Sequence, residues 1–279
     1  MDAPVNMTHV TRVEPPRGWA ELRLGELVEH RELTLFMVWR DVKVRYKQTA
    51  LGVAWAVLQP LMTMVIFTII FGRIAGLPSD GVPYPLFALA GLLPWQLFAA
   101  SLTGAANSLV GNAGLLTKVY FPRLIVPLAA TLSTFVDFLV SCAVLVLLML
   151  YYRVAPSPAI VALPLFFALA LATAVGVGLW FAAMNVRYRD VQYVLPFLVQ
   201  LWLFASPVAY SASLIHSPAG RAIYALNPMA GAIQGFRWAL LGAPPPGPLV
   251  WPSVAVSVVL LVSGLFFFKR MEDTFADVI

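Results

Sequence analysis

The sequence has few charged residues and a single cysteine. Only 11% of its 279 residues are Asp, Glu, Lys or Arg, whereas 61% are hydrophobic and the mean hydropathy is +0.84. This composition excludes an ordinary soluble domain, in which about a quarter of the residues are charged. Because Cys142 stands alone in an apolar stretch, a disulfide framework and a Cys-based metal site are excluded as well.

The sequence also lacks the motifs of several catalytic sites. It contains no Gly-Lys dipeptide, and therefore no phosphate-binding loop with which this chain would itself hydrolyse ATP. His9, His30 and His216 are scattered, and none has a second His or Cys at metal-ligand spacing. No two carboxylates share an apolar run. We therefore expect no catalytic residue, metal or cofactor on this chain, which favours a conduit over an enzyme.

What is present is a series of long apolar runs. Each holds roughly 20 residues, the length of helix that crosses a bilayer, and none alternates as a membrane β-strand does. Asp137 is the only charge in the run from Leu124 to Tyr152. We predict an all-α integral membrane protein with six transmembrane helices. The predicted spans are 51–73, 84–110, 124–152, 159–184, 191–210 and 249–268.

The basic residues predict the topology of these spans. An even number of spans places both termini on one side of the membrane, and 14 of the 18 Lys and Arg residues fall on that side. The positive-inside rule makes it the cytoplasm. Because the basic residues flank spans and form no domain of their own, we expect membrane lipids as partners and no nucleic acid.

The segment that precedes the first span predicts an amphipathic helix. Leu35, Val38, Trp39, Val42 and Tyr46 recur at helical spacing, while the cations lie on another face. A helix of this kind lies at the membrane interface and turns its cations toward anionic lipid or ligand. A basic flank that only sets the topology is the alternative.

Polar and small residues inside the spans have two interpretations each. Asp137 lies on a polar stripe with neighbouring Ser and Thr residues. It is either a carboxylate that hydrogen bonds hold between helices or part of a proton relay. Gly176 and Gly178 each follow an Ala by four residues, which predicts close helix packing within one subunit or between two.

Two connections are informative. The loop "GNAGLLTKVYFPR", from Gly111 to Arg123, is short and apolar although its charges place it in the cytoplasm. We predict a short helix, capped by Asn112 and stopped at Pro122, that docks in a groove of another protein; a helix end on the membrane surface is the alternative. In the region 211–249, the Asn227-Pro228 pair predicts a break between two short external helices.

Four stretches, "WRDVKVRYKQTALGVAWAVLQPL", "LLPWQLF", "LLTKVYFPRLIVPL" and "NPMAGAIQGFRWALLG", resemble in order and spacing the permeases of ABC-2 type exporters of polysaccharide and polyol phosphate. The resemblance covers about Leu33 to Ile279. It implies a homodimer in the bacterial cytoplasmic membrane with two copies of a separate ATPase, which carries ATP and magnesium. The implied cargo is a glycan on a polyprenyl diphosphate lipid.

The resemblance also assigns roles to residues. It divides the chain into a cytoplasmic segment, 1–50, with a gate helix, and a transmembrane domain, 51–279, with external gate helices at about 211–245. The implied coupling helix, at about 112–122, supplies an ATPase contact made of Leu115, Leu116, Thr117, Lys118, Val119, Tyr120, Phe121, Pro122 and Arg123. The implied gate and diphosphate entrance consists of Trp39, Arg40, Asp41, Lys43, Arg45, Tyr46, Lys47, Arg187 and Arg189. The candidate lumen residues are Asn107, Asp137, Trp180, Phe181, Trp202, Phe204 and Tyr210.

Several rival functions differ in their sequence requirements. An importer permease would carry a cytoplasmic Glu-Ala-Ala motif, which the sequence lacks. A related ABC-2 permease that exports a drug or small lipid would share the topology and the coupling loop. A proton-coupled carrier would require Asp137, and an intramembrane enzyme would require a cluster of reactive residues.

Overall fold

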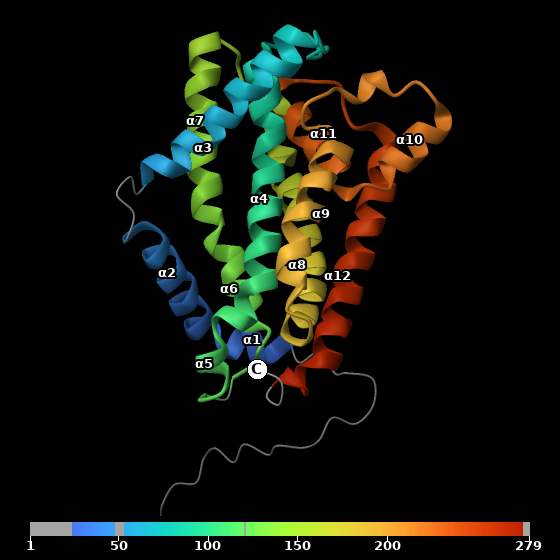
Figure 1. Cartoon of the computed structure of the whole chain (residues 1–279). Coiled ribbons are helices and arrows are strands. Elements are labelled where there is room, and N and C mark those ends of the chain that lie inside the picture. Colours follow the sequence, from blue (N-terminus) through green and yellow to red (C-terminus); the bar gives the residue numbers. More distant parts are fainter. Residues whose placement is uncertain (1–23, 48–52, 120, 276–279) are drawn as a thin grey trace, which may run out of the picture.

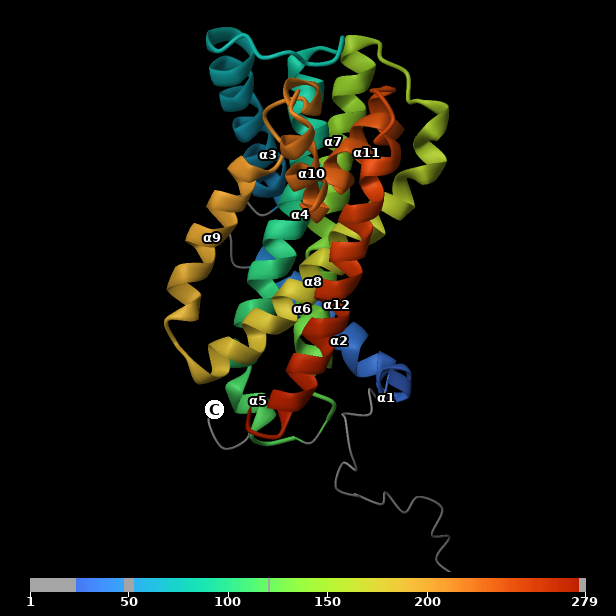
Figure 2. The same cartoon turned by 90° about the vertical axis from the view of Figure 1, so that its right-hand side faces the viewer.

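The structure is a bundle of helices. The computed structural model describes residues 24–47, 53–119 and 121–275, and within these ranges it contains helices and turns but no β-strand. The long helices run side by side (Figures 1 and 2). One end of the bundle, here called the basal end, carries α1 (Leu24–Glu29), α5 (Ala113–Leu116) and the C-terminal end of α12 (Val250–Glu272). The predicted all-α fold is confirmed.

Five helical stretches among the described residues are long and apolar enough to cross a membrane. They match five of the six predicted spans. The stretches are Ala54–Ile74, Tyr84–Gly111, Ile125–Tyr152, Pro158–Arg187 and Gly247–Glu272. They contain, in chain order, α3 (Val53–Phe67) with the π-helix η1 (Thr68–Ile74), α4 (Tyr84–Gly111), α6 (Ile125–Ser133) with α7 (Phe135–Tyr152), η2 (Pro158–Ala162) with α8 (Leu163–Arg187), and η4 (Gly247–Leu249) with α12.

The fifth predicted span, 191–210, is shorter in the structure. Its helix, α9, covers Val191–Ala205, and 15 residues at a rise of about 1.5 Å reach about 22 Å, less than the hydrocarbon thickness of about 30 Å. The helix ends because Ser206 precedes a proline and takes an extended conformation, with φ −105° and ψ 149°. The predicted span was longer than the helix because the sequence stays hydrophobic past the break.

The third span is bent at its polar residues. Ser133 and Thr134 turn their hydroxyl groups back onto the carbonyl oxygens of Ala130 and Thr131, at 2.8 and 2.7 Å. Such bonds draw a helix carbonyl away from the regular ladder and bend the helix. The bend separates α6 from α7 and places Asp137 in the first turn of α7.

The predicted pair of short helices is confirmed. They are α10 (Pro218–Ala225) and α11 (Pro228–Leu241), which follow the short turn η3 (Ala212–Leu214). The side chain of Asn227 caps α11 by accepting a bond of 3.0 Å from the Met229 N–H. Unlike an exposed loop, α11 is buried along most of its length.

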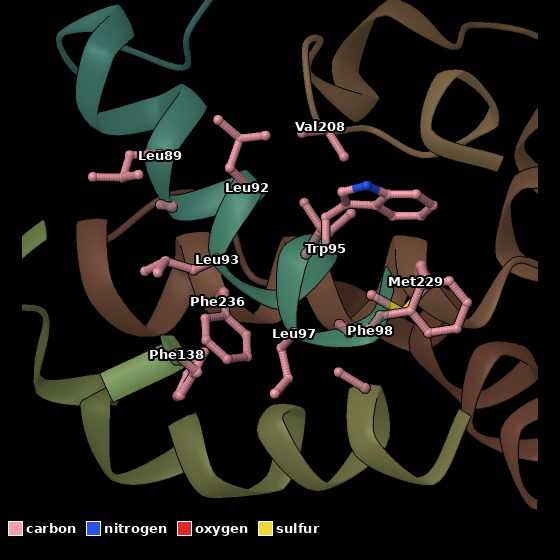
Figure 3. Close-up of a cluster of buried hydrophobic side chains, with 14 of the residues drawn as sticks. Leu89, Leu92, Leu93, Trp95, Leu97, Phe98, Phe138, Val208, Met229 and Phe236 are labelled. Carbon is pink, nitrogen blue, oxygen red and sulfur yellow. The ribbon is translucent and has the colours of Figure 1, made fainter. Parts of the chain in front are cut away.

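The larger hydrophobic core surrounds α4. Figure 3 shows α4 side chains facing α7 and α11, with Phe138 and Phe236 next to each other. These two rings meet edge to face with centroids 6.1 Å apart, an arrangement that stabilises aromatic pairs. Most residues of α4 are buried, so this helix lies within the bundle.

Small residues let α8 approach both of its neighbours. Gly176 lies directly against Gly264 of α12, and a Cβ added at Gly178 would meet the Ala105 Cβ of α4 at 2.8 Å. The close-packing faces predicted from glycine spacing thus serve contacts within one chain, which decides between the two interpretations for this pair of glycines.

A second core lies at the basal end. It joins α2 (Arg31–Lys47) to the end of α8, the loop before α6 and the C-terminal end of α12. Its buried members include Met37, Phe121, Phe268 and Phe275, which are at most 5% exposed. We call this cluster the basal core.

Candidate functional site

The predicted coupling helix is shorter than expected. Helix α5 is a single turn, Ala113–Leu116, within what we call the coupling segment, residues 112–123. Asn112 stands at the N-cap position, but its side chain makes no cap bond. It donates instead to the Ser108 carbonyl at 2.8 Å and accepts from Arg40. The predicted cap was wrong because a guanidinium from α2 takes the amide oxygen.

The coupling segment has an outer and an inner side. Thr117, Lys118 and Val119 are exposed, whereas Phe121 is buried in the basal core. Four residues of the segment are half-buried: Leu115, Leu116, Pro122 and Arg123. Tyr120 lies outside the described residues. A partner would therefore meet the outer side, and Phe121 instead anchors the segment.

The inner side of the segment is joined to α12. The Arg123 guanidinium donates to the carbonyl oxygen of Glu272, and the backbone N–H of Arg123 donates to the Glu272 carboxylate at 3.1 Å. Lys269 neutralises the same carboxylate at 2.6 Å. Sequence reasoning missed Glu272; its only signal was the i, i+3 spacing from Lys269.

A hydrogen bond joins the coupling segment to the predicted gate helix, α2. Arg40 donates to the Asn112 Oδ1 at 2.8 Å and to the neighbouring Asp41 carboxylate at 2.8 and 3.0 Å. Of the predicted apolar face, Leu35 and Trp39 are exposed, at 65% and 59%, whereas Val38, Val42 and Tyr46 are half-buried. Arg40 is half-buried and turned inward, so it does not join the outward cations.

The C-terminal turn of α2 reaches Asp137. Arg45 forms an ion pair with one carboxylate oxygen of Asp137 and donates to the Ser133 hydroxyl at 3.3 Å, while the Tyr46 hydroxyl donates to the other carboxylate oxygen. We call these four residues the Asp137 cluster. Burial, together with the bond to Asp137, raises the pKa of Tyr46 to about 12, so the phenol keeps its proton at neutral pH. The Asp137 carboxylate is therefore held by two side chains of α2.

The remaining entrance residues lie in two places. Lys43 and Lys47 are exposed on α2, and the Lys43 ammonium lies 5.2 Å from the Trp39 ring centroid. Arg187 and Arg189 are exposed at the turn between α8 and α9. Figure 2 shows α2 and this turn on different sides of the bundle, so one chain does not bring the two groups together.

The candidate lumen residues do not converge on one cavity among the described residues. Asn107 accepts from Asn185 at 3.1 Å, Trp180 stacks on Phe267 at 4.0 Å, and Trp202 meets Phe98 at 4.9 Å. These contacts are between helices of one chain.

The other lumen candidates differ in exposure. Phe181 and Tyr210 are half-buried, whereas Phe204 is 61% exposed. Trp202 also donates to Asn227 at 3.0 Å and borders a hollow of about 570 Å³ between α9, α10 and α12. Aromatic side chains that look alike in the sequence thus have unrelated surroundings.

Arg237 is a buried cation that sequence reasoning treated only as a topology signal. It is 3% exposed, and its guanidinium donates to four backbone carbonyl groups. The acceptors are the carbonyl oxygens of Pro207 and Val208, both at 2.7 Å, and of Phe87 and Tyr210, both at 3.2 Å. It thereby joins α4 and α11 to the segment 206–211 that follows α9.

The sequence is similar to known proteins along most of its length. The sequence matches the ABC-2 type transporter family model over residues 32–241. It is 31% identical over 256 residues to the O-antigen export system permease protein RfbA of Myxococcus xanthus, covering 90% of this chain and 97% of the relative. It is 28% identical over 253 residues to the RfbA of Klebsiella pneumoniae, covering 89% and 95%. It is 26% identical over 245 residues to the polysialic acid transport protein KpsM of Escherichia coli, covering 84% and 91%.

Proposed function

Because the chain belongs to the ABC-2 type transporter family, we propose that it is the transmembrane subunit of an ATP-driven exporter of a lipid-linked polysaccharide. The names of its relatives, which are permeases for O-antigen and a transport protein for polysialic acid, support a polysaccharide cargo. The exporter lies in the bacterial cytoplasmic membrane with both termini in the cytoplasm. Two copies of this chain associate with two copies of an ATPase subunit, which binds ATP and magnesium.

The observation that carries this proposal is the two-sided coupling segment. Its outer residues, Thr117 to Val119, are exposed at the basal end, while Phe121 is buried in the basal core. An exposed edge that carries polar, charged and apolar side chains, next to a buried anchor, suits a contact that must transmit force to the bundle. The basal end is then the cytoplasmic end, where the ATPase docks.

Movement of the coupling segment has two direct routes into the bundle. Asn112 is bonded to Arg40 of α2, and Arg123 is bonded to Glu272 at the end of α12. Closure of the ATPase pair on ATP would displace the segment and shift the equilibrium between two packings of the bundle. Helix α2 acts as the cytoplasmic gate, and α10 and α11 as the external gate.

The cations of α2 suit the head of the proposed cargo. Lys43 and Lys47 are exposed, and Arg45 is partly accessible, with 39% of its side chain exposed. A diphosphate carries several negative charges and accepts short, charge-assisted bonds from ammonium and guanidinium groups. The cargo head enters at this helix.

A test begins with co-expression of the chain with an ATPase encoded near it and reconstitution of the pair in lipid nanodiscs. Val119→Asp places a charge on the outer side of the coupling segment, where the wild-type side chain is 52% exposed. The matched control is Val161→Asp, at an 85% exposed valine of η2, which precedes α8 at its other end. We expect Val119→Asp to abolish co-purification and permease-dependent ATP hydrolysis, and Val161→Asp to preserve both.

Cargo is assayed separately, as ATP-dependent movement of a lipid-linked glycan into proteoliposomes. An ATPase complex that survives Val119→Asp would refute the docking surface. A stable complex that transports a small lipid but no glycan would refute the polysaccharide cargo and leave the ABC-2 exporter class intact.

A further inference from the structure

The Asp137 cluster lies deep along a membrane span. Asp137 is the thirteenth residue of the helical stretch Ile125–Tyr152, so it lies about 18 Å from the basal start of that stretch. Charged groups at such depth are costly and are found paired or at sites of transport. Arg45 therefore places a positive charge from α2 at a point far along this span.

The ion pair is accessible. The side chains of Arg45 and Asp137 are 39% and 32% exposed, so the pair is not sealed within the helix contacts. Arg45 is held by two acceptors, Asp137 and the hydroxyl of Ser133. Both acceptors come from the bend between α6 and α7. The bond to Asp137 is exposed and open to an incoming anion, whereas Ser133 itself is buried.

Asp137 has a second partner besides Arg45. Its second carboxylate oxygen accepts from the Tyr46 hydroxyl, and it lies in the first turn of α7. A carboxylate in that position is favoured by the helix dipole. If the Asp137 carboxylate releases the Arg45 guanidinium, it still accepts the hydrogen bond from Tyr46 and still lies in the favourable field of the α7 helix dipole.

A guanidinium binds carboxylate and phosphate with the same pair of N–H donors. We propose that Asp137 occupies Arg45 in place of the phosphate of the lipid cargo, and that the anionic headgroup binds by displacing Asp137 from Arg45. This inference rests on the proposed function and names the residue that sets the affinity for the headgroup. Return of the carboxylate would then release the headgroup, as transport requires binding that is weak enough to reverse.

The test measures binding of farnesyl diphosphate, a water-soluble isoprenyl diphosphate, to the purified full chain in detergent. Farnesol and inorganic diphosphate serve as controls for the tail and the head. Removing the competing carboxylate in Asp137→Asn should tighten binding about tenfold, and Arg45→Ala should weaken it by about tenfold. Ser133→Ala removes the second acceptor of Arg45 without changing any charge and should tighten binding by about twofold to threefold.

A double-mutant cycle separates displacement from simple charge repulsion. If Asp137 acts by occupying Arg45, Asp137→Asn has no effect on affinity when Arg45 is already Ala. The inference is overturned if Asp137→Asn tightens diphosphate binding equally in the Arg45→Ala background. It is also overturned if neither Asp137→Asn nor Ser133→Ala changes the affinity of the otherwise wild-type chain. Ser133→Ala decides the matter if Asp137→Asn does not yield folded protein.

The same experiment distinguishes this inference from the proposed function. If the wild-type chain binds farnesyl diphosphate no better than farnesol, the diphosphate-lipid cargo fails and the inference fails with it. If the wild type binds the diphosphate selectively but the substitutions at Asp137 and Ser133 change nothing, only the role of Asp137 is refuted.

Discussion

The guanidinium of Arg40 donates a hydrogen bond of 2.8 Å to the side-chain oxygen of Asn112, which lies 72 positions later in the sequence. The bond joins the middle of α2 to the residue from which α5 begins. Since Asn112 also donates to the Ser108 carbonyl, it is held by α4 while it holds α2. In the exporter we propose, it is a direct connection between the ATPase contact and the gate helix.

Loss of this bond should weaken coupling. Asn112→Ala removes the acceptor, and hydrogen bonds to charged groups contribute about 1.5–3 kcal/mol. We expect export per ATP hydrolysed to fall about tenfold, because about 1.4 kcal/mol corresponds to a factor of ten, while the ATPase still binds. The measurement is glycan transport together with ATP hydrolysis in proteoliposomes.

The control for this prediction is Asn112→Asp, which keeps an acceptor oxygen and adds a negative charge facing Arg40. It should retain coupling. Equal losses in the Ala and Asp variants would show that the bond to Arg40 is not what matters at this position.

A second prediction concerns the contact between α8 and α12. The backbone of Gly264 lies against the Gly176 carbonyl, so a methyl group has no room there. We expect Gly264→Ala to force the helices apart and destabilise the protein by about 1–3 kcal/mol, as overpacking does. Thermal unfolding in detergent should show a lower Tm.

Gly111→Ala is the matched control, because nothing lies within 4 Å of a Cβ added at Gly111. Its Tm should stay unchanged or rise slightly, since alanine favours a helix. A Gly264→Ala protein as stable as wild type would contradict the close approach of the two backbones.

Much of the fold was predictable because the membrane constrains it. Long apolar runs lead to helices, and the Asn227-Pro228 break was readable from local backbone chemistry. The end of α9 was missed although Ser206 and Pro207 are a break of the same kind, because the span was drawn from hydropathy and the sequence stays hydrophobic past them. Hydropathy reports burial in lipid or protein equally and does not mark such a break.

The site was less predictable because its bonds join distant segments. The sequence shows that Asp137 is the only charge in its span. It gives no sign that the partner of Asp137 is Arg45, which lies 92 positions away. The helical wheel of α2 placed Arg40 with the cations turned toward lipid or ligand, whereas its bond to Asn112 turns it inward. Partners of this kind follow from tertiary packing, and a single sequence carries no periodic signal for them.

A third prediction concerns the basal core. Phe275 follows α12, is 1% exposed, and packs edge to face on Phe268 with ring centroids 5.3 Å apart. We expect Phe275→Ala to destabilise the protein by about 3–5 kcal/mol, the usual effect of removing a buried ring. Phe266→Ala, at a 42% exposed position of α12, should have a much smaller effect. Similar unfolding temperatures for the two variants would contradict the burial of Phe275.

The last prediction concerns Arg237, whose four carbonyl partners hold the segment after α9. Its guanidinium carbon also lies 3.4 Å from the Phe87 ring centroid, a cation–π contact in a site without water-exposed surface. Arginine has five N–H donors in a planar fork, whereas lysine has three donors on one nitrogen. Four acceptors at separate positions therefore require arginine.

We expect stability to fall from wild type to Arg237→Lys and further to Arg237→Met. The methionine variant leaves the Phe87, Pro207, Val208 and Tyr210 carbonyl groups without this donor, and each unpaired buried group costs about 1–3 kcal/mol. Limited proteolysis should then cleave residues 206–217 faster in both variants. The matched control is Arg270→Met, at an exposed arginine near the basal end of α12, which should leave stability and cleavage of residues 206–217 unchanged. If Arg237→Lys resists proteolysis as well as wild type does, the planar fork is not required and the carbonyl groups are satisfied in another way.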